Sequence, residues 1–280
     1  MTTIDKPEIG QQVTADGIRA NYLAAGSANA AAGTVLLLHG SGPGVTAYAN
    51  WRLVIPALAE RFHVVAPDLV GFGYSDRPDG AAYGPDTWVA QVLSLLDGLG
   101  LDHAHVVGNS FGGAIALRLA ATVPQRVRRL VLMGSMGVHF PITEGLERVW
   151  GYEPSPENMR RVLDTFAYSR DLVNDDLARV RYESSIQPGF QEAFAAMFPS
   201  PRQRWVDALC TPEDELRALP HHTLVVHGRE DQVIPVAASH RLADLLPNAD
   251  LAVFSRCGHW SMIERNAEFN RIVGDFLAGD

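Results

Sequence analysis

The pentad Gly108-Asn-Ser-Phe-Gly112 constrains this chain more than any other stretch of its sequence. The apolar residues before it, which end at Val107, predict a short strand, and the small residues after it predict a helix. A G-x-S-x-G pattern between a strand and a helix is typical of a nucleophile elbow, a sharp turn that exposes a serine hydroxyl. Glycine at both ends lets the backbone turn that sharply, so Ser110 can hold a strained conformation. The alternative interpretation is a tight turn with an incidental serine.

Composition limits the classes of protein to which the chain can belong. With 280 residues, 47% of them hydrophobic, it can bury a sizeable core in one large domain or in a domain with an insertion. A net charge of −9 provides no basic surface for nucleic acid or for an anionic membrane. The polar residues 1–8 and the lack of a long apolar run predict no leader and no membrane span. Two cysteines do not make a disulfide framework, so we expect a cytoplasmic protein.

Strand and helix patterns alternate along most of the chain. We expect strands at 11–14, 18–23, 34–39, 63–66, 103–107, 127–133, 223–227 and 251–254, and helices that include 51–61, 87–99, 236–246 and 266–277. This alternation predicts an α/β fold, a mostly parallel sheet of about eight strands with helices on both faces. After the sixth strand, residues 138–208 have helical patterns, many charges and several prolines but no strand. We therefore expect a core formed by 1–137 and 209–280 and a helical lid formed by 138–208.

A serine hydroxyl is a weak nucleophile, so Ser110 needs a base and a third group that orients the base. Asp231 follows the expected strand at 223–227, and His259 follows the expected strand at 251–254. Both lie beyond the carboxyl ends of strands, where open α/β sheets place their sites. The order serine, acid, histidine is the one that accompanies this kind of elbow. Asp231 could instead cap the next helix, and Glu230 is a competing acid beside it.

The other nine histidines do not form a convincing metal-ligand pattern with carboxylates or thiolates, so we predict no metal site. His39 ends a strand beside the loop Gly40-Ser-Gly-Pro-Gly44, and we expect it to hold that loop by hydrogen bonds. The loop and the elbow together predict an oxyanion hole. One donor is the amide of Phe111, and the other is the amide of Ser41, with Gly42 as the alternative.

Four segments together resemble the meta-cleavage product hydrolases, which are carbon–carbon bond hydrolases of the α/β-hydrolase fold from bacterial aromatic degradation. They are His39-Gly-Ser-Gly-Pro-Gly44, Gly108-Asn-Ser-Phe-Gly-Gly113, His227-Gly-Arg-Glu-Asp231 and Gly258-His-Trp260. The resemblance covers nearly the whole chain and includes the insertion, through residues 144–151 and 186–190. It is strongest to members that act on ring-fission products of monocyclic aromatics, with hydrogen or a small alkyl group at C6.

The resemblance implies a substrate of the 2-hydroxy-6-oxo-hexa-2,4-dienoate type. The dienol would first be ketonised, and water would then cleave the C5–C6 bond with serine attack at the C6 carbonyl. The products would be 2-hydroxypenta-2,4-dienoate and a small carboxylic acid. The resemblance implies no metal or organic cofactor, and a homo-oligomer with a dimer favoured. A carboxylesterase of the same fold, or a ligand receptor that retains the three residues, are the alternatives.

The substrate carboxylate needs a cationic partner, and by resemblance Arg181 binds it with help from Asn109. The sequence supports this independently, because Arg179 has acids at helical i±3 and i±4 spacing whereas Arg181 has none. Alternatively, Arg181 lies along the lid surface and Asn109 only completes a turn. Further pocket candidates, each of which could equally be a core residue, are Trp260, Phe166, Trp150 and Ile142.

Overall fold

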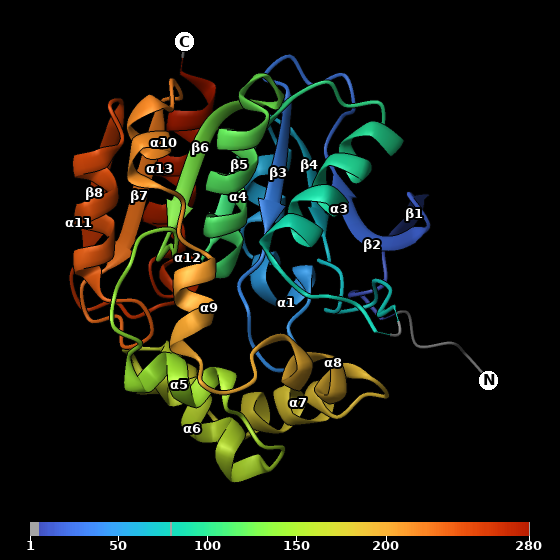
Figure 1. Cartoon of the computed structure of the whole chain (residues 1–280), viewed down its shortest axis with the longest axis vertical. Coiled ribbons are helices and arrows are strands. Elements are labelled where there is room, and N and C mark those ends of the chain that lie inside the picture. The colour runs from blue at the N-terminus through green and yellow to red at the C-terminus, as the bar shows by residue number, and fades with distance from the viewer. Residues whose placement is uncertain (1–5, 79, 280) are drawn as a thin grey trace.

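Eight strands form one central sheet in the order β1-β2-β4-β3-β5-β6-β7-β8 (Figure 1). They span Gln11–Ala15 (β1), Ile18–Ala25 (β2), Thr34–Leu38 (β3), His63–Pro67 (β4), Ala104–Asn109 (β5), Val127–Met133 (β6), Thr223–Gly228 (β7) and Ala249–Phe254 (β8). β1 pairs with β2 and β2 with β4 in antiparallel orientation, and all other pairs are parallel. The predicted mostly parallel sheet of eight strands is therefore confirmed.

The computed structural model describes residues 6–78 and 80–279. Residues 1–5, which belong to the stretch where we expect no leader, lie outside the described part of the chain. Within that part, no helix is both long enough and apolar enough to cross a membrane.

The central strands are apolar along their whole length because both faces of the sheet are covered. In β3, Leu36 and Leu38 belong to one buried cluster, whereas Val35 and Leu37 belong to another. Successive side chains of a strand point to opposite faces, so the two clusters are the two cores on either side of the sheet. The C-terminal ends of the parallel strands thus lie side by side at one end of the sheet, between the two cores.

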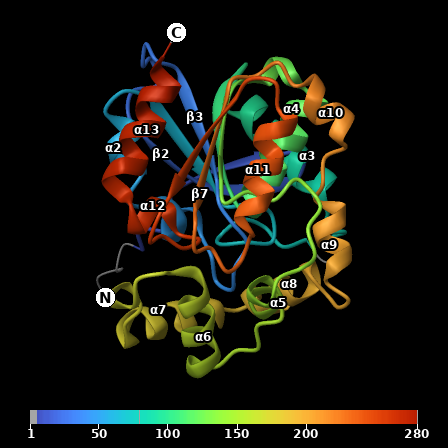
Figure 2. The same ribbon diagram turned by 90° about the vertical axis from the view of Figure 1, so that its left-hand side faces the viewer.

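Helices cover both faces of the sheet (Figure 2). They span Ala47–Trp51 (α1), Ile55–Ala59 (α2), Pro85–Gly98 (α3), Phe111–Thr122 (α4), Glu213–Ala218 (α10), Val236–Leu245 (α11), Ser261–Glu264 (α12) and Asn266–Ala278 (α13). The cluster that contains Val35 also contains the buried residues of α1, α2 and α13, whereas those of α3, α4 and α11 belong to the other cluster. Two α-layers therefore enclose the sheet.

The prediction of a single helix over residues 51–61 is wrong, because the structure has two short helices here, α1 and α2. Pro56 lies in the first turn of α2. A proline lacks an N–H and clashes with the carbonyl four residues earlier, so a single helix cannot continue from Arg52 through it. Leu53, between the two helices, is 42% exposed.

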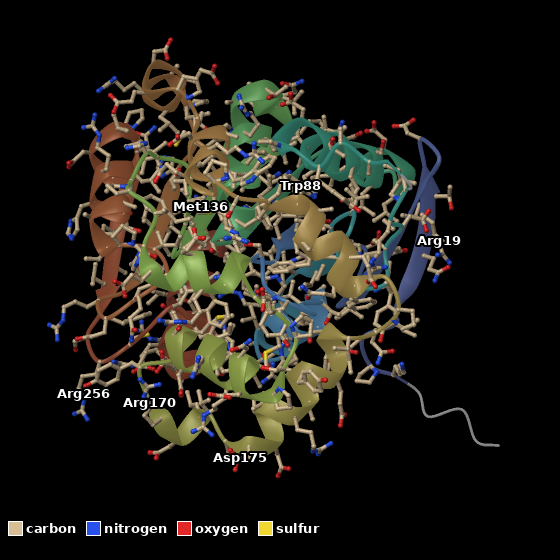
Figure 3. All side chains as sticks on the ribbon, turned by 60° about the horizontal axis from the view of Figure 1, so that its bottom comes forward. Arg19, Trp88, Met136, Arg170, Asp175 and Arg256 are labelled. Atoms are coloured by element: carbon tan, nitrogen blue, oxygen red, sulfur yellow. The ribbon has the colours of Figure 1, made fainter. Side chains whose placement is uncertain are left out.

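The segment between β6 and β7 is helical, which confirms the insertion after the sixth strand. Its helices span Glu144–Trp150 (α5), Pro156–Phe166 (α6), Asp175–Ser185 (α7), Phe190–Met197 (α8) and Gln203–Ala208 (α9). Thr143, Ser155 and Asn174 cap α5, α6 and α7 by accepting a hydrogen bond from the amide three residues later. These helices form a layer at one end of the sheet, and Figure 3 looks onto their outer face, which exposes Arg170 and Asp175. The division of the chain at residues 137/138 and 208/209 stays a prediction.

We expect Gly112→Ala to destabilise the protein. A Cβ at this position would lie 2.3 Å from the carbonyl oxygen of Leu38 and 2.6 Å from that of His39, and neither backbone can retreat without moving β3. The free energy of unfolding should fall by about 2 kcal/mol or more, as for other overpacked core sites. Urea unfolding measures this change. Gly274→Ala is the matched control, because it is also helical but its Cβ would meet only Leu58 Cδ2 at 3.9 Å. Equal stability of the two variants would contradict the prediction.

Candidate active site

Ser110 occupies the turn between β5 and α4 in a strained conformation, with φ 54° and ψ −114°. Its amide donates to the Met133 carbonyl at 2.9 Å, and its carbonyl accepts from the Met136 amide at 3.1 Å. A Cβ on Gly108 would lie 2.5 Å from the carbonyl oxygen of Gly112, so the strand and the helix approach too closely for any larger residue. These bonds and this close packing hold the turn in place, as expected where a strained backbone conformation persists.

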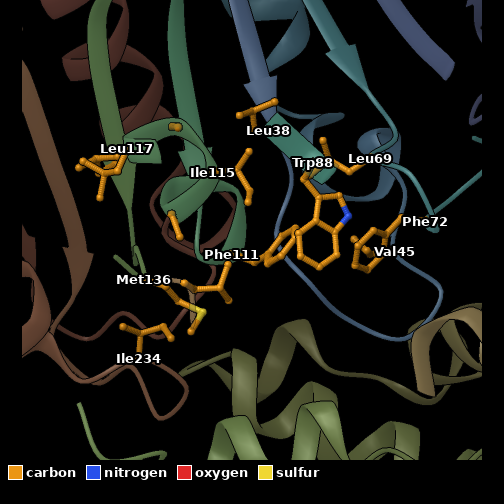
Figure 4. Packing of buried hydrophobic residues seen from close by; sticks show 14 of the residues in the cluster. Leu38, Val45, Leu69, Phe72, Trp88, Phe111, Ile115, Leu117, Met136 and Ile234 are labelled. Carbon is orange, nitrogen blue, oxygen red and sulfur yellow. The ribbon is translucent and has the colours of Figure 1, made fainter. Parts of the chain in front are cut away.

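The elbow helix also carries the side chain that anchors this end of the sheet. The ring of Phe111 packs edge-on against Trp88 at 4.6 Å between centroids, within the buried cluster shown in Figure 4. Met136 and Ile234 belong to the same cluster. Phe111 is therefore held by its side chain. Its amide lies at the N-terminus of α4, where a helix leaves backbone N–H groups unpaired.

Asp231 and His259 come together as a hydrogen-bonded pair beyond β7 and β8. His259 Nδ1 lies 2.6 Å from Asp231 Oδ2, and the other oxygen of Asp231 accepts from the amides of Val233 and Ile234 at 2.7 and 3.0 Å. Asp231 does not cap the next helix, because Pro235 is the N-cap residue of α11 and the carboxylate bonds the turn before it. Glu230 accepts instead from the Cys257 amide at 3.0 Å.

A second histidine supports the same carboxylate. His227 Nε2 lies 3.1 Å from Asp231 Oδ2, and its Nδ1 lies 2.6 Å from the hydroxyl of Ser239. Burial alone would raise the pKa of Asp231, but the charge of His259 and the hydrogen bonds from His227 and His259 hold the pKa below its usual range. Asp231 is thus an anion that orients His259.

The glycine-rich loop after β3 is held from both sides. His39 Nε2 accepts from the Leu69 amide at 2.9 Å, so its Nδ1 carries the proton and donates to the Gly40 carbonyl at 2.8 Å. Burial lowers the pKa of His39 to about 4, which keeps this ring neutral. From the lid side, Trp150 Nε1 donates to Ser41 Oγ at 2.9 Å. His39 therefore has the structural role that we expected.

The loop presents backbone donors beside the elbow. Within the described part of the chain, the amides of Ser41 and Gly42 form no hydrogen bond. A Cβ on Gly40 would lie 2.5 Å from Asn109 Oδ1 and 3.4 Å from Ser110 Cβ. The loop thus lies directly against the serine, and its free amides can serve an oxyanion there.

A cavity of about 120 Å³ opens between this edge of the sheet and the lid. It is lined by Gly40, Ser41, Gly42, Val45, Ala49, Asn50, Arg52, Asn109, Phe166, Leu172, Leu177, Arg181, His259, Trp260, Met262 and Ile263. Ser110 is 3% exposed and is not among them, but Asn109, Gly40 and His259 bring the cavity wall next to it. Most of the wall is apolar, and its charged groups are cationic.

Arg181 reaches the cavity from α7, and its Nη2 donates to the Pro43 carbonyl at 3.1 Å. Burial lowers its pKa to about 10, so it remains a cation at neutral pH. Arg179 pairs on the outside with Asp176 at 3.6 Å and Glu183 at 3.1 Å, as the spacing predicted. Across residues 6–78 and 80–279, neither Arg181 nor Arg52 forms an ion pair with a carboxylate. The cavity therefore holds guanidinium groups without an internal counter-ion.

The remaining predicted pocket residues divide into two groups. Phe166 and Trp260 line the cavity and stack on each other at 5.1 Å between ring centroids, and the ring of Phe166 also stacks on His259 at 5.6 Å. Trp150 and Ile142 do not line it. Trp150 stacks on Phe198 at 4.3 Å, and Ile142 packs against the core.

Three residues near the site were missed by sequence reasoning. His227 lies within β7, four residues before Asp231 in the loop that follows, and this spacing offered no signal because the two residues do not share a helix. Asn50 accepts from the Gly40 amide at 3.2 Å, and its Nδ2 has no partner in the described part of the chain. Arg52, the C-cap residue of α1, lines the cavity. Cys257, two residues before His259, is a buried free thiol.

The sheet order, the elbow and the acid–histidine pair define a hydrolase of the α/β-hydrolase class. A family model described as alpha/beta hydrolase fold matches residues 33–266. The chain is 59% identical to the 2-hydroxymuconate semialdehyde hydrolase of Pseudomonas sp. strain CF600, over 98% of this chain and 95% of that one. It is 55% identical, over the full length of both, to a 2-hydroxy-6-oxo-2,4-heptadienoate hydrolase of Pseudomonas putida.

Solved structures agree with these relatives. The meta-cleavage product hydrolase from Pseudomonas fluorescens IP01 is 54% identical and superposes with a TM-score of 0.95, over 97% of this chain and 98% of that one. The chain belongs to the meta-cleavage product hydrolases, and it is a hydrolase of carbon–carbon bonds.

Proposed function

We propose that the protein hydrolyses 2-hydroxy-6-oxo-2,4-dienoates from monocyclic aromatics, with Ser110 as nucleophile, His259 as base and Asp231 as the group that orients the base. The observation that carries this proposal is the cavity itself. One wall holds His259, bonded to an anionic Asp231 beside the elbow, and another holds Arg181 without a counter-ion. A substrate with a carboxylate at one end and a ketone at the other matches both walls.

In this proposal the diketone form of the substrate places its C6 carbonyl at Ser110. His259 accepts the serine proton as the bond from Ser110 Oγ to C6 forms, and the C6 oxygen becomes an oxyanion. The amides of Phe111 and Ser41, or Gly42, stabilise that oxyanion, each contributing about 3 kcal/mol in the chemical step. The C5–C6 bond then breaks, and its electron pair moves into the dienolate, which His259 protonates.

Water completes the reaction. It attacks the acyl carbon on Ser110 and gives a proton to His259. His259 returns that proton to Ser110 Oγ as the acyl–oxygen bond breaks and the small carboxylic acid leaves, so that one water is consumed for each bond cleaved. The other product is 2-hydroxypenta-2,4-dienoate. A homo-oligomer, with a dimer favoured, and a cytoplasmic location stay predictions.

A stopped-flow absorbance assay tests the substrate class. The yellow meta-fission products of catechol and 3-methylcatechol should bleach rapidly, and that of 2,3-dihydroxybiphenyl should bleach slowly. Turnover of p-nitrophenyl esters without bleaching of any dienoate would instead favour a carboxylesterase, and the proposal would fail.

Replacing Arg181 should separate dienoates from neutral esters. We expect Arg181→Ala to lower kcat/KM for the dienoate by about 10²-fold, chiefly through KM, because a lost hydrogen-bonded charge pair costs about 2–5 kcal/mol. Turnover of a neutral p-nitrophenyl ester should change little, because the ester has no carboxylate to bind. Arg179→Ala is the matched control on the same helix, since its partners are Asp176 and Glu183 on the outer face. Equal losses for ester and dienoate would contradict the assignment of Arg181.

A further inference from the structure

The loop that carries His259 is held by three consecutive amides, each bonded to a different part of the molecule. The Cys257 amide donates to Glu230 at 3.0 Å, the Gly258 amide to Glu264 Oε2 at 2.6 Å, and the His259 amide to the Phe166 carbonyl at 2.8 Å. Of these partners, only Phe166 belongs to the insertion. The loop therefore touches the lid through its own backbone.

Glu264 connects the same two segments a second time. Its Oε2 accepts from the Gly258 amide, and its Oε1 accepts from the Ser169 amide at 2.8 Å. Ser169 lies in the lid, just after α6, and Glu264 ends α12, a short helix at the end of the sheet that faces the lid (Figures 1 and 2). One carboxylate thus bridges the histidine loop and the lid.

The two segments also approach each other too closely for independent movement. A Cβ on Gly258 would lie 2.6 Å from the Phe166 carbonyl oxygen and 2.8 Å from the Tyr168 nitrogen. Residues 166–168 therefore run in close backbone contact with Gly258 and His259.

The carboxylate of Glu264 has no competing role on the surface. Within residues 6–78 and 80–279 it forms no ion pair, whereas its neighbour Arg265 pairs with Glu268 at 2.6 Å. Glu264 does not line the cavity, so it cannot bind substrate directly. Among the described residues, its two oxygens accept only from the amides of Ser169 and Gly258, and charge-assisted hydrogen bonds of this kind are the strong ones.

We propose that Glu264 is a positioning residue that ties the lid segment 166–169 to the loop of His259 and so sets the place of the base. The inference rests on the proposed role of His259. A base that moves by about 1 Å loses about 10²-fold in rate. Arg181 is held separately, through Pro43, so substrate binding should depend much less on Glu264.

Three variants test this coupling with the full-length enzyme and the dienoate derived from 3-methylcatechol. Glu264→Ala removes both acceptors, and we expect kcat to fall by about 10²-fold while KM changes by less than about threefold. Glu264→Gln keeps one acceptor oxygen, so its kcat should fall by only about tenfold. Ser169→Pro removes the lid donor alone, at a φ of −77° that a proline ring accepts. It should also lower kcat, although within the described residues the Ser169 amide bonds Glu264 rather than the histidine loop and Ser169 does not line the cavity.

Control experiments distinguish a change in the position of His259 from a loss of folding stability. Glu268→Gln is the matched substitution nearby and should keep wild-type kcat, because Glu268 pairs only with Arg265. Thermal unfolding should show that Glu264→Gln and Ser169→Pro remain folded at the assay temperature. The dissociation constant of the dienoate, measured with each change in a Ser110→Ala background, should stay within about threefold of that background. If Glu264→Ala fails to fold, the kinetics of Glu264→Gln and Ser169→Pro test the coupling.

The outcomes are distinct. A raised KM with unchanged kcat in Glu264→Gln, or wild-type kcat in Ser169→Pro, would overturn the coupling. If the effects of Ser169→Pro and Glu264→Ala add in full, the two residues act independently and the proposal also fails. His259→Ala identifies the other kind of failure. If it cleaves the dienoate normally, the proposed function is wrong, whereas its loss of activity beside a normal Glu264→Gln would reject this inference alone.

Discussion

Ser110→Ala should abolish carbon–carbon cleavage while leaving dienoate binding intact. Without the hydroxyl no acyl-enzyme can form, and loss of the nucleophile in a serine–histidine–acid site lowers kcat by about 10⁴-fold or more. Binding should survive because the groups expected to hold the dienoate, Arg181 and Asn109, line the cavity independently of Ser110. The elbow should also survive, because alanine retains the backbone bonds to Met133 and Met136.

Single-turnover absorbance measurements give both quantities, since the bound dienoate can be followed as it bleaches or persists. Ser135→Ala is the control, because Ser135 is a fully buried serine near the elbow whose hydroxyl donates to the Met136 carbonyl. It should retain kcat within about threefold, as a neutral buried hydrogen bond affects folding more than chemistry. Retention of wild-type cleavage by Ser110→Ala would exclude a serine nucleophile.

Asp231→Asn is the second change with a large expected effect. The amide can still accept from Val233 and Ile234, but its NH₂ group then faces His259 Nδ1. His259 must accept that hydrogen bond and carry its own proton on Nε2, where it can no longer act as a base. We expect kcat to fall by about 10⁴-fold with little change in KM, as in other sites where an asparagine imposes the wrong tautomer.

Glu230, the acid next to Asp231, provides the comparison for Asp231→Asn. Glu230→Gln should cost less than about tenfold, because Glu230 bonds the Cys257 amide and Arg229 rather than His259. Steady-state kinetics of both variants on the same dienoate measure the difference. If Glu230→Gln were the more damaging of the two, the acid would have been assigned to the wrong residue.

Much of the fold could be predicted from the sequence because its signals are local. Glycine at 108 and 112 marks a turn that larger residues cannot make, and continuous apolar runs such as 34–38 mark strands covered on both faces. The break in strand–helix alternation after Val127–Met133 likewise marked the insertion. The helix expected over 51–61 failed at Pro56, where a breaker inside an apolar pattern was underweighted.

The site was predictable in part for a related reason. Open α/β sheets bring the ends of successive strands to one edge, so residues after strands at 223–227 and 251–254 could be expected to meet the elbow. The structure brings Asp231 and His259 within 2.6 Å, and it places Arg181 at the cavity with Asn109. Lid aromatics were less predictable, because Phe166 faces the cavity whereas Trp150 supports the loop at Ser41.

The sequence by itself determined the turn at Ser110, the parallel sheet, the helical insertion and the chain order of serine, acid and histidine. Each of these depends on backbone freedom and apolar spacing within a few residues, which the amino acids specify locally. Only the tertiary structure decided that His227 also supports Asp231, that Arg52 faces the cavity and that Glu264 bridges the lid and the histidine loop. The sequence separation of 95 between Ser169 and Glu264 shows why. Contacts across such separations arise only when the lid packs onto the finished sheet, and no local pattern encodes where that packing brings a side chain.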